Sequence, residues 1–201
     1  MGGTMTAAKP QPSASWPVPP PDGYTVDDLL TLPDLPPHTE LIDGSLVFVS
    51  PQRSFHSLTI DVLMDGLRRT APGDLRVRRE MTVVIDKRQG PEPDVCVLRA
   101  EGVPHAENES HYRARYAVLA VEVVSADSER RDRERKPQLY AQAGIRHFWR
   151  VERGEDGLPV VHVYELDQAT GAYGLTGIHH NQVKLSVPYD IDIDLTAVER
   201  L

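Results

Sequence analysis

One acidic residue interrupts the most apolar stretch of this chain. Residues 116–124 read Tyr-Ala-Val-Leu-Ala-Val-Glu-Val-Val, and a continuous run of this kind is typical of a central strand buried on both faces of a sheet. The carboxylate of Glu122 is therefore expected in the interior, where an unpaired charge would cost several kcal/mol. A fold for this chain has to bring a compensating partner to Glu122.

Apolar periodicity divides the remainder of the chain into helices and strands. Thr25 is a suitable N-cap for a helix over residues 26–32, and residues 54–70 carry apolar side chains at helical spacing. The Asp43-Gly44 step between two apolar runs predicts a β-hairpin over residues 40–49. Further strands are predicted over residues 75–85, 94–98, 145–151 and 158–166, with another pair within 173–187 and an edge strand whose acids Asp190, Asp192 and Asp194 face solvent.

The order of these elements predicts the fold class. A helix is expected after the central strand, ending near Ala143 with Gly144 as its C′ residue. A strand, helix, strand order beside hairpins implies a mixed β-sheet flanked by helices, with the β-hairpin near its N-terminal end. The predicted class is therefore α/β.

Length and composition are those of an ordinary globular domain. The 201 residues are 40% hydrophobic and 26% charged, which predicts a single domain over residues 23–201. Residues 1–22 are rich in proline and are predicted to form a disordered tail. The single cysteine, Cys96, cannot form an internal disulfide and is expected to be packing. No apolar segment is long enough for a signal-peptide core or a membrane helix, so the expected location is the cytoplasm, with no membrane partner.

A second acid stands at the start of another apolar strand. Asp94 follows Pro91-Glu92-Pro93 and precedes Val-Cys-Val-Leu. Carboxylates at the ends of neighbouring strands would face each other across a gap that suits a hard divalent cation such as Mg²⁺, which takes oxygen ligands. For either acid alone, a hydrogen bond to the backbone or a pair with an arginine is the simpler explanation. The two acids together favour the metal site.

Several short motifs occur together in a recognisable order. They are Pro91-Glu92-Pro93-Asp94, then Glu122-Val123-Val124-Ser125, then Asp132, Lys136, Tyr140 and Gly144, then a strand with Trp149, all preceded by Glu40-Leu41-Ile42-Asp43-Gly44-Ser45-Leu46-Val47, Ser50-Pro51 and His56. In this order and spacing, the chain resembles the Uma family of proteins described as restriction endonucleases, within the PD-(D/E)XK nuclease superfamily. The resemblance covers roughly residues 24–152.

The resemblance implies a set of active-site residues. Asp94 and Glu122 would be ligands of Mg²⁺ or Mn²⁺, with Glu40 completing the acidic cluster. In the superfamily a lysine usually follows the second acid by two residues, but Val124 occupies that position here. Lys136 resembles a migrated lysine offered from the following helix, although Pro137 beside it would kink a helix or force one to start nearby. The remaining accessory candidates are His56, Asp132 and Tyr140.

The implied function is metal-dependent endonuclease activity on nucleic acid, with DNA the expected form. The net charge of −8 argues against a polyanionic partner, although a bound cation reverses the charge of an acidic site. One alternative is a catalytically inactive nuclease fold that binds or regulates. Another is a metal-dependent hydrolase of a small molecule, which would need an enclosed pocket. Cutting both strands of a duplex would be simplest for a homodimer.

The charged segment at residues 129–136 has a less specific explanation. Arg131, Arg133 and Glu134 are predicted to form a solvated, ion-paired face, whereas Asp132 and Lys136 would share a helix face. Together with five further arginines, this charged segment is also a candidate for a basic lip that contacts the nucleic-acid backbone: Arg68, Arg69, Arg76, Arg78 and Arg79. The pair His179-His180 lacks the spacing of a zinc site and is expected at the surface.

Overall fold

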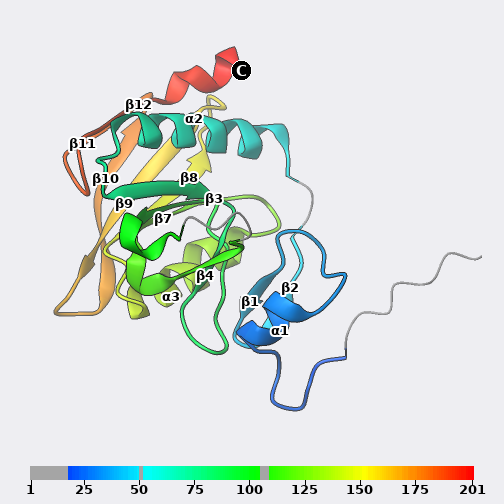
Figure 1. Ribbon diagram of the computed structural model, residues 1–201. Coiled ribbons are helices and arrows are strands. Elements are labelled where there is room, and N and C mark those ends of the chain that lie inside the picture. Colours follow the sequence, from blue (N-terminus) through cyan, green and yellow to red (C-terminus); the bar gives the residue numbers. More distant parts are fainter. Residues whose placement is uncertain (1–17, 50–51, 105–108) are drawn as a thin grey trace, which may run out of the picture.

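A six-stranded sheet forms the centre of the protein, whose computed structural model describes residues 18–49, 52–104 and 109–201 (Figure 1). The predicted tail lies largely outside this part of the chain, as does the Ser50-Pro51 pair. The strands stand in the order β10 (Ala172–His180), β9 (Pro159–Asp167), β8 (His147–Arg153), β7 (Ala117–Val123), β5 (Val95–Arg99), β3 (Leu75–Arg79).

The sheet is mixed, as the order of elements predicts. Strand β7 runs parallel to β8 and antiparallel to β5, and the other pairs are antiparallel. A crossover that contains a helix joins β7 to β8, which is what a parallel pair requires. Almost every residue of β7 is buried, so the apolar run is indeed a central strand, and the α/β class is confirmed.

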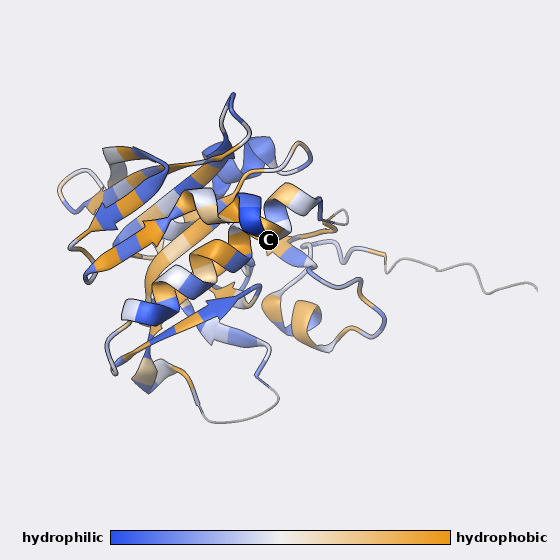
Figure 2. Ribbon diagram, turned by 90° about the horizontal axis from the view of Figure 1, so that it is seen from above, coloured by the Kyte–Doolittle hydropathy of each residue, from blue (hydrophilic) through white to orange (hydrophobic). Residues whose placement is uncertain are grey.

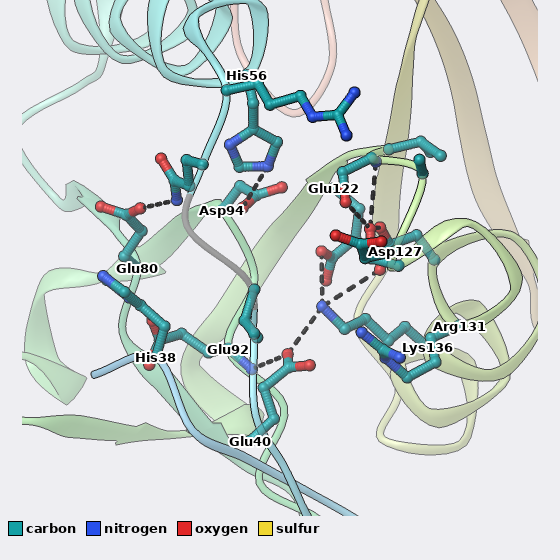
Figure 3. A pocket seen from close by; sticks show the side chains of 18 of the residues that line it. His38, Glu40, His56, Glu80, Glu92, Asp94, Glu122, Asp127, Arg131 and Lys136 are labelled. Atoms are coloured by element: carbon teal, nitrogen blue, oxygen red, sulfur yellow. Dashed lines mark hydrogen bonds and ion pairs between the residues drawn. The ribbon is translucent and has the colours of Figure 1, made fainter. Parts of the chain in front are cut away.

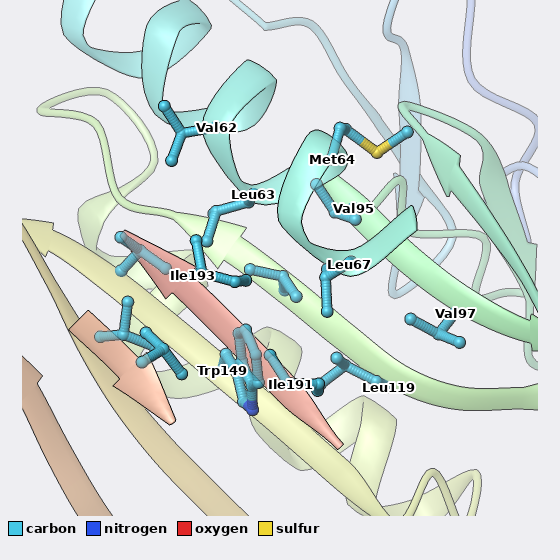
Figure 4. Packing of buried hydrophobic residues seen from close by; sticks show 14 of the residues in the cluster. Val62, Leu63, Met64, Leu67, Val95, Val97, Leu119, Trp149, Ile191 and Ile193 are labelled. Atoms are coloured by element: carbon cyan, nitrogen blue, oxygen red, sulfur yellow. The ribbon is translucent and has the colours of Figure 1, made fainter. Parts of the chain in front are cut away.

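Two apolar layers cover the sheet. Helix α2 (Ser54–Thr70) and strands β11 (Gln182–Leu185) and β12 (Ile191–Asp194) pack on one face, where Leu63 and Leu67 meet Trp149 and Ile193 (Figure 4). Gly66 permits the close approach, because a Cβ there would lie 2.5 Å from Cγ1 of Ile193. Helix α3 (Lys136–Gln142) packs with the second cluster on the opposite face. The central strands are accordingly the most hydrophobic part of the ribbon (Figure 2).

The N-terminal elements lie at one side of the sheet (Figure 1). Helix α1 (Val26–Thr31) starts with a capping box between Thr25 and Asp28. Strands β1 (Glu40–Ile42) and β2 (Ser45–Val47) form the predicted hairpin, in which Asp43 and Gly44 both have positive φ, as a two-residue type I′ turn requires. The hairpin is joined to the rest of the protein by mutual backbone hydrogen bonds between Leu41 and Gly90.

Some predicted strands are wrong in extent or in partner. Residues 75–85 form two strands, because Glu80 adopts φ +51° and turns the chain between β3 and β4 (Thr82–Val84). Strand β4 leaves the main sheet and pairs with β6 (His111–Arg113). The two strands predicted within residues 173–187 are present as β10, which pairs with β9, and β11, which pairs with β12. On β12 the acids are exposed and the isoleucines buried, as predicted.

Short helices complete the described chain. They are the 3₁₀ turns η1 (Ala100–Gly102), η2 (Ala114–Tyr116) and η4 (Leu195–Arg200), and the π-helical turn η3 (Arg131–Arg135), which runs directly into α3. In the described ranges, no helix combines the length and the apolar character needed to cross a membrane.

Candidate active site

The register of β5 and β7 places two of the predicted acids together. Val95 is paired with Val121, so the preceding residue, Asp94, stands opposite Glu122 at the ends of adjacent strands. Oδ2 of Asp94 accepts a hydrogen bond of 2.6 Å from the backbone N–H of Val123. This bond fixes the Asp94 carboxylate at the sheet edge beside Glu122.

Glu122 receives two donors from the segment that follows it. Lys136 Nζ lies 2.8 Å from Oε2, and the hydroxyl of Tyr140 donates to Oε1. Their spacing of four residues places both on one face of α3. The compensation that a buried acid requires therefore comes from one helix.

Pro137 does not disturb this helix, because it stands in the first turn. It comes directly after Lys136, where the helical chain continues from the turn η3 into α3 without a break. The preceding turn η3 is π-helical, and the N–H of Lys136 donates to the carbonyl of Arg131, five residues earlier. Single π turns are often found at functional sites. Pro137 thus lies at the start of α3, near one of the two outcomes expected from the sequence, but the chain before it is already helical.

The ammonium of Lys136 meets three carboxylates. Its Nζ lies 2.8 Å from Glu40 Oε1 and from Glu122 Oε2, and 3.4 Å from Asp132 Oδ1. The contact with Glu122 is a hydrogen bond, and the contacts with Glu40 and Asp132 are ion pairs. All four side chains are nearly inaccessible, at 1–6% exposure. We call Glu40, Glu122, Asp132 and Lys136 the pocket floor.

Two neighbours hold the carboxylates of the floor in place. The backbone N–H of Glu92 donates to Glu40 Oε1 at 2.8 Å, and the hydroxyl of Ser128 donates to Asp132 Oδ2. The first contact explains the Pro-Glu-Pro motif, since it aims an N–H from the loop before Asp94 at the hairpin residue Glu40. The β1–β2 hairpin is thereby attached to the site through its first residue.

Burial and charge act on the floor in opposite senses. Burial would lower the pKa of Lys136, but the three surrounding carboxylates hold that pKa well above its ordinary value. Burial raises the pKa of Glu122 strongly, against the opposing effect of Lys136, and it also raises the pKa of Asp132. Lys136 is therefore charged at neutral pH, where it can donate hydrogen bonds but cannot act as a general base.

His56, at the start of α2, approaches the second acid. Its Nε2 lies 3.2 Å from Asp94 Oδ1, whereas its Nδ1 is buried without a hydrogen-bond partner among the described residues. Burial alone would lower the pKa of His56, but the hydrogen bond and charge of Asp94 outweigh it and raise that pKa. His56 thus contributes a third kind of polar group beside the two carboxylates.

These side chains surround a pocket of about 260 Å³ (Figure 3). Of the sequence candidates, the lining includes Glu40, His56, Asp94, Glu122, Asp132 and Lys136. Tyr140 is absent from the lining and acts on the pocket through Glu122. Asp94, Glu122 and Lys136 are thus brought together by the fold.

Other lining residues were missed in the sequence. Glu92 lies within the Pro-Glu-Pro motif and was not singled out, and its raised pKa, due mainly to burial, marks it as part of the site. Arg131 was expected on a solvated face, but it lines the pocket, because the π turn changes which side chains share a face. The Pro-Glu-Pro motif could have pointed to Glu92, and the closeness of Arg131 to Lys136 in the sequence could have pointed to Arg131. The π turn itself gives no signal in the sequence.

Of the arginines in the predicted basic lip, Arg131 alone lines the pocket. The five arginines outside residues 129–136 are absent from the lining, and two of them form ion pairs. Arg69 pairs with Asp65, and Arg79 pairs with Asp61 and Glu80.

The donor chemistry of the pocket fits a divalent cation. Asp94 and the floor provide four carboxylates against one ammonium, which leaves an excess of negative charge in a confined space. Within the described ranges, no three His, Cys, Asp or Glu side chains are already arranged around a common metal position. Mg²⁺ rarely needs such a cage, since it is commonly held by one or two carboxylates, waters and substrate phosphates. Asp94 and Glu122 are the two carboxylates at the strand ends.

Comparison with known proteins gives one family and one fold. The model of the family Uma2, described as "Putative restriction endonuclease", matches residues 26–197. A crystal structure described as a "putative nuclease belonging to DUF820", from Anabaena variabilis, is similar with a TM-score of 0.63 and 19% identity, over 82% of this chain and 89% of that one. At this identity the likeness establishes the fold, which is the mixed α/β fold expected. No curated protein matches the chain.

Proposed function

The chain belongs to the Uma2 family, and from this premise we propose that it is a nuclease that hydrolyses phosphodiester bonds of nucleic acid, DNA in particular, with a divalent cation. The observation that carries the proposal is the meeting of Asp94, Glu122 and Lys136 at one edge of the sheet. The two carboxylates can bind a cation, and the ammonium, which contacts Glu122, can interact with a phosphate. We assign Asp94 and Glu122, with Glu40 beside them, as the cation ligands.

The cation would supply the chemistry that the side chains lack. When bound, Mg²⁺ or Mn²⁺ lowers the pKa of a bound water and offsets negative charge on the phosphoryl oxygens. Asp94, which accepts from the N–H of Val123 at Oδ2 and contacts His56 at Oδ1, would hold the cation together with Glu122. Tyr140 holds Glu122 in orientation from behind.

Lys136 acts as a fixed cationic donor in this proposal. Its pKa is well above neutral, so the ammonium persists and can orient the attacking water or stabilise developing charge on the phosphate. Glu40 and Asp132 keep the ammonium in position through contacts of 2.8 Å and 3.4 Å. His56, which contacts Asp94, is an accessory residue whose role is to orient that carboxylate.

The geometry bears on the two alternatives. If the side chains of Asp94, Glu122 and Lys136 lay far apart, the alternative of a catalytically inactive relative would be favoured. The three side chains instead lie together. A hydrolase of a small molecule would need a pocket for the whole substrate. The volume of about 260 Å³ is below the roughly 300–1,000 Å³ typical of small-molecule sites, which favours a substrate that inserts one phosphodiester group.

A cleavage assay with charge-removing variants tests the proposal. Wild type, Asp94→Asn and Lys136→Ala are incubated with plasmid DNA and with RNA, in Mg²⁺ and in EDTA. We expect cleavage by the wild type in Mg²⁺ alone, and a loss of about 100-fold or more in both variants, as for removal of a group that stabilises transition-state charge. Asp192→Asn, an exposed acid on β12, is the matched control and should cleave like the wild type. Cleavage that survives Asp94→Asn or EDTA would contradict the proposal.

A further inference from the structure

Three arginines line the pocket without an acidic partner. They are Arg53, before α2, Arg131 in the π turn, and Arg153 at the end of β8, and we call them the arginine rim. Within the described ranges none of them forms an ion pair or a side-chain hydrogen bond, although the guanidinium of Arg153 lies 5.7 Å from the ring centre of Phe55. Three separate segments thus direct cations to one opening.

The neighbours of Arg131 show that acids were available to it. Arg130 pairs with Glu134 at 3.4 Å, Arg133 with Glu129 at 2.6 Å, and Arg135 with Asp43. All three are in the same charged segment, and each pairs with an acid that does not line the pocket. Arg131 alone of these four lines the pocket. Its side chain is therefore kept apart from the surface network.

The burial of Arg131 points to a missing acceptor. The residue is half-buried, and its Nε is shielded from solvent with no hydrogen-bond partner in the described part of the chain. A buried donor without an acceptor is unfavourable. The closest acid in sequence, Asp132, accepts from Ser128 through Oδ2 and faces Lys136, at 3.4 Å, through Oδ1. The described part of the chain thus leaves the Nε of Arg131 open to an acceptor on a ligand.

The chemistry of the guanidinium selects the acceptor. Its planar fork of donors matches the paired oxygens of a phosphate group. Resting on the proposed function, we propose that the arginine rim binds the phosphates of the nucleic-acid backbone, with Arg131 contacting the phosphate that enters the pocket. Arg53 and Arg153, both exposed, contact phosphates that stay outside. A local cluster of this kind gives a chain with a net charge of −8 a place for a polyanion.

Binding measured separately from cleavage tests this assignment. Fluorescence anisotropy of a labelled DNA oligonucleotide is followed over a salt series, with Ca²⁺ replacing Mg²⁺ because it takes the same oxygen ligands. We expect Arg131→Gln to weaken binding about tenfold and to reduce the slope of log affinity against log salt by about 0.7–0.9, the value for one phosphate contact. Arg131→Lys should keep the slope. Arg130→Gln, with the same charge change on the outer face, should bind like the wild type.

The outcomes separate the rim from the nuclease proposal. If Arg131→Gln and Arg130→Gln give equal affinity and slope, or if the wild type binds no oligonucleotide, the rim assignment is wrong. If Arg131→Gln alone loses affinity while no protein cleaves in Mg²⁺, the rim stands and the nuclease proposal fails. If the wild type cleaves and Arg131→Gln binds and cleaves as well as the wild type, the nuclease proposal stands and the rim assignment fails.

Discussion

The pocket floor and the arginine rim use the same kinds of charge in opposite ways. On the floor, one ammonium contacts three carboxylates inside the protein, and every side chain is nearly inaccessible. On the rim, three guanidinium groups have no acidic partner among the described residues. The floor is thus held together by its own charges, whereas the rim depends on a ligand. The difference teaches that stability and binding are separable at this site.

The largest effect on stability is expected for Lys136→Ala. Removal of one partner of a buried ion pair typically costs about 3–5 kcal/mol, because the remaining carboxylates stay buried without a counter-charge. Urea unfolding in EDTA measures this loss. Mg²⁺ should recover more stability in the variant than in the wild type, because a cation then replaces the ammonium. If Mg²⁺ raised the free energy of unfolding of both proteins equally, the claim that the floor is held together by its own charges would be contradicted.

A smaller effect is expected for Tyr140→Phe. The substitution keeps the ring but removes the hydroxyl that donates to Glu122 Oε1. A buried acceptor left unpaired costs about 1–3 kcal/mol, which urea unfolding should show. Tyr173→Phe is the matched control, since its hydroxyl donates only to the carbonyl of Ile145, away from the floor. In the cleavage assay Tyr140→Phe should lose activity and Tyr173→Phe should not. A similar loss of cleavage in both variants would argue against a role specific to Tyr140.

The exposed pair of Asp43 and Arg135 should contribute about 0.5 kcal/mol, as surface ion pairs do. Hydrogen bonding by Arg135 is the main cause that lowers the pKa of Asp43 below its ordinary value of 3.8. A folded pKa below the unfolded one stabilises the protein above about pH 3.8, and the contribution is lost as the pH falls through the folded value. Asp43→Asn, which suits the positive φ, should therefore differ from the wild type at pH 7 and match it at pH 2. A difference of the same size at both values would exclude the charge as its source.

The smallest effect on stability is expected on the rim. Arg131→Gln removes a cation that has no partner in the described protein, so its midpoint of urea unfolding should equal or exceed that of the wild type. Together with weakened oligonucleotide binding, this result would place Arg131 in ligand binding alone. A loss of stability comparable to that of Tyr140→Phe would instead give the rim a structural role.

Much of the floor could be predicted from the sequence, because its signals are local. Glu122 is a charge in an otherwise apolar strand, and Asp94 begins another such strand. A buried carboxylate needs a partner for its charge. The four-residue spacing of Asp132 and Lys136 places these two on one helix face, and Lys136 can be that partner. The hairpin turn at Asp43-Gly44 and the helix over residues 54–70 were equally local and are confirmed.

The rim could not be predicted, because it depends on contacts between distant segments. Arg53, Arg131 and Arg153 come from three elements, and no periodicity relates them. The π turn that separates Arg131 from its neighbours adds one residue per hydrogen bond, which a helical pattern does not reveal. The split of residues 75–85 at Glu80 has a similar origin, since a non-glycine residue at positive φ leaves little trace in the sequence.

The central claim is that Asp94 and Glu122 hold a divalent cation, and calorimetric titration with Mn²⁺ tests it most directly because it requires no knowledge of the substrate. Wild type is compared with the double variant Asp94→Ala, Glu122→Ala, with an unfolding curve for each to show that both are folded. We predict a binding heat for the wild type that saturates at one or two ions and is lost in the double variant. A wild-type titration that matches that of the double variant would contradict the account.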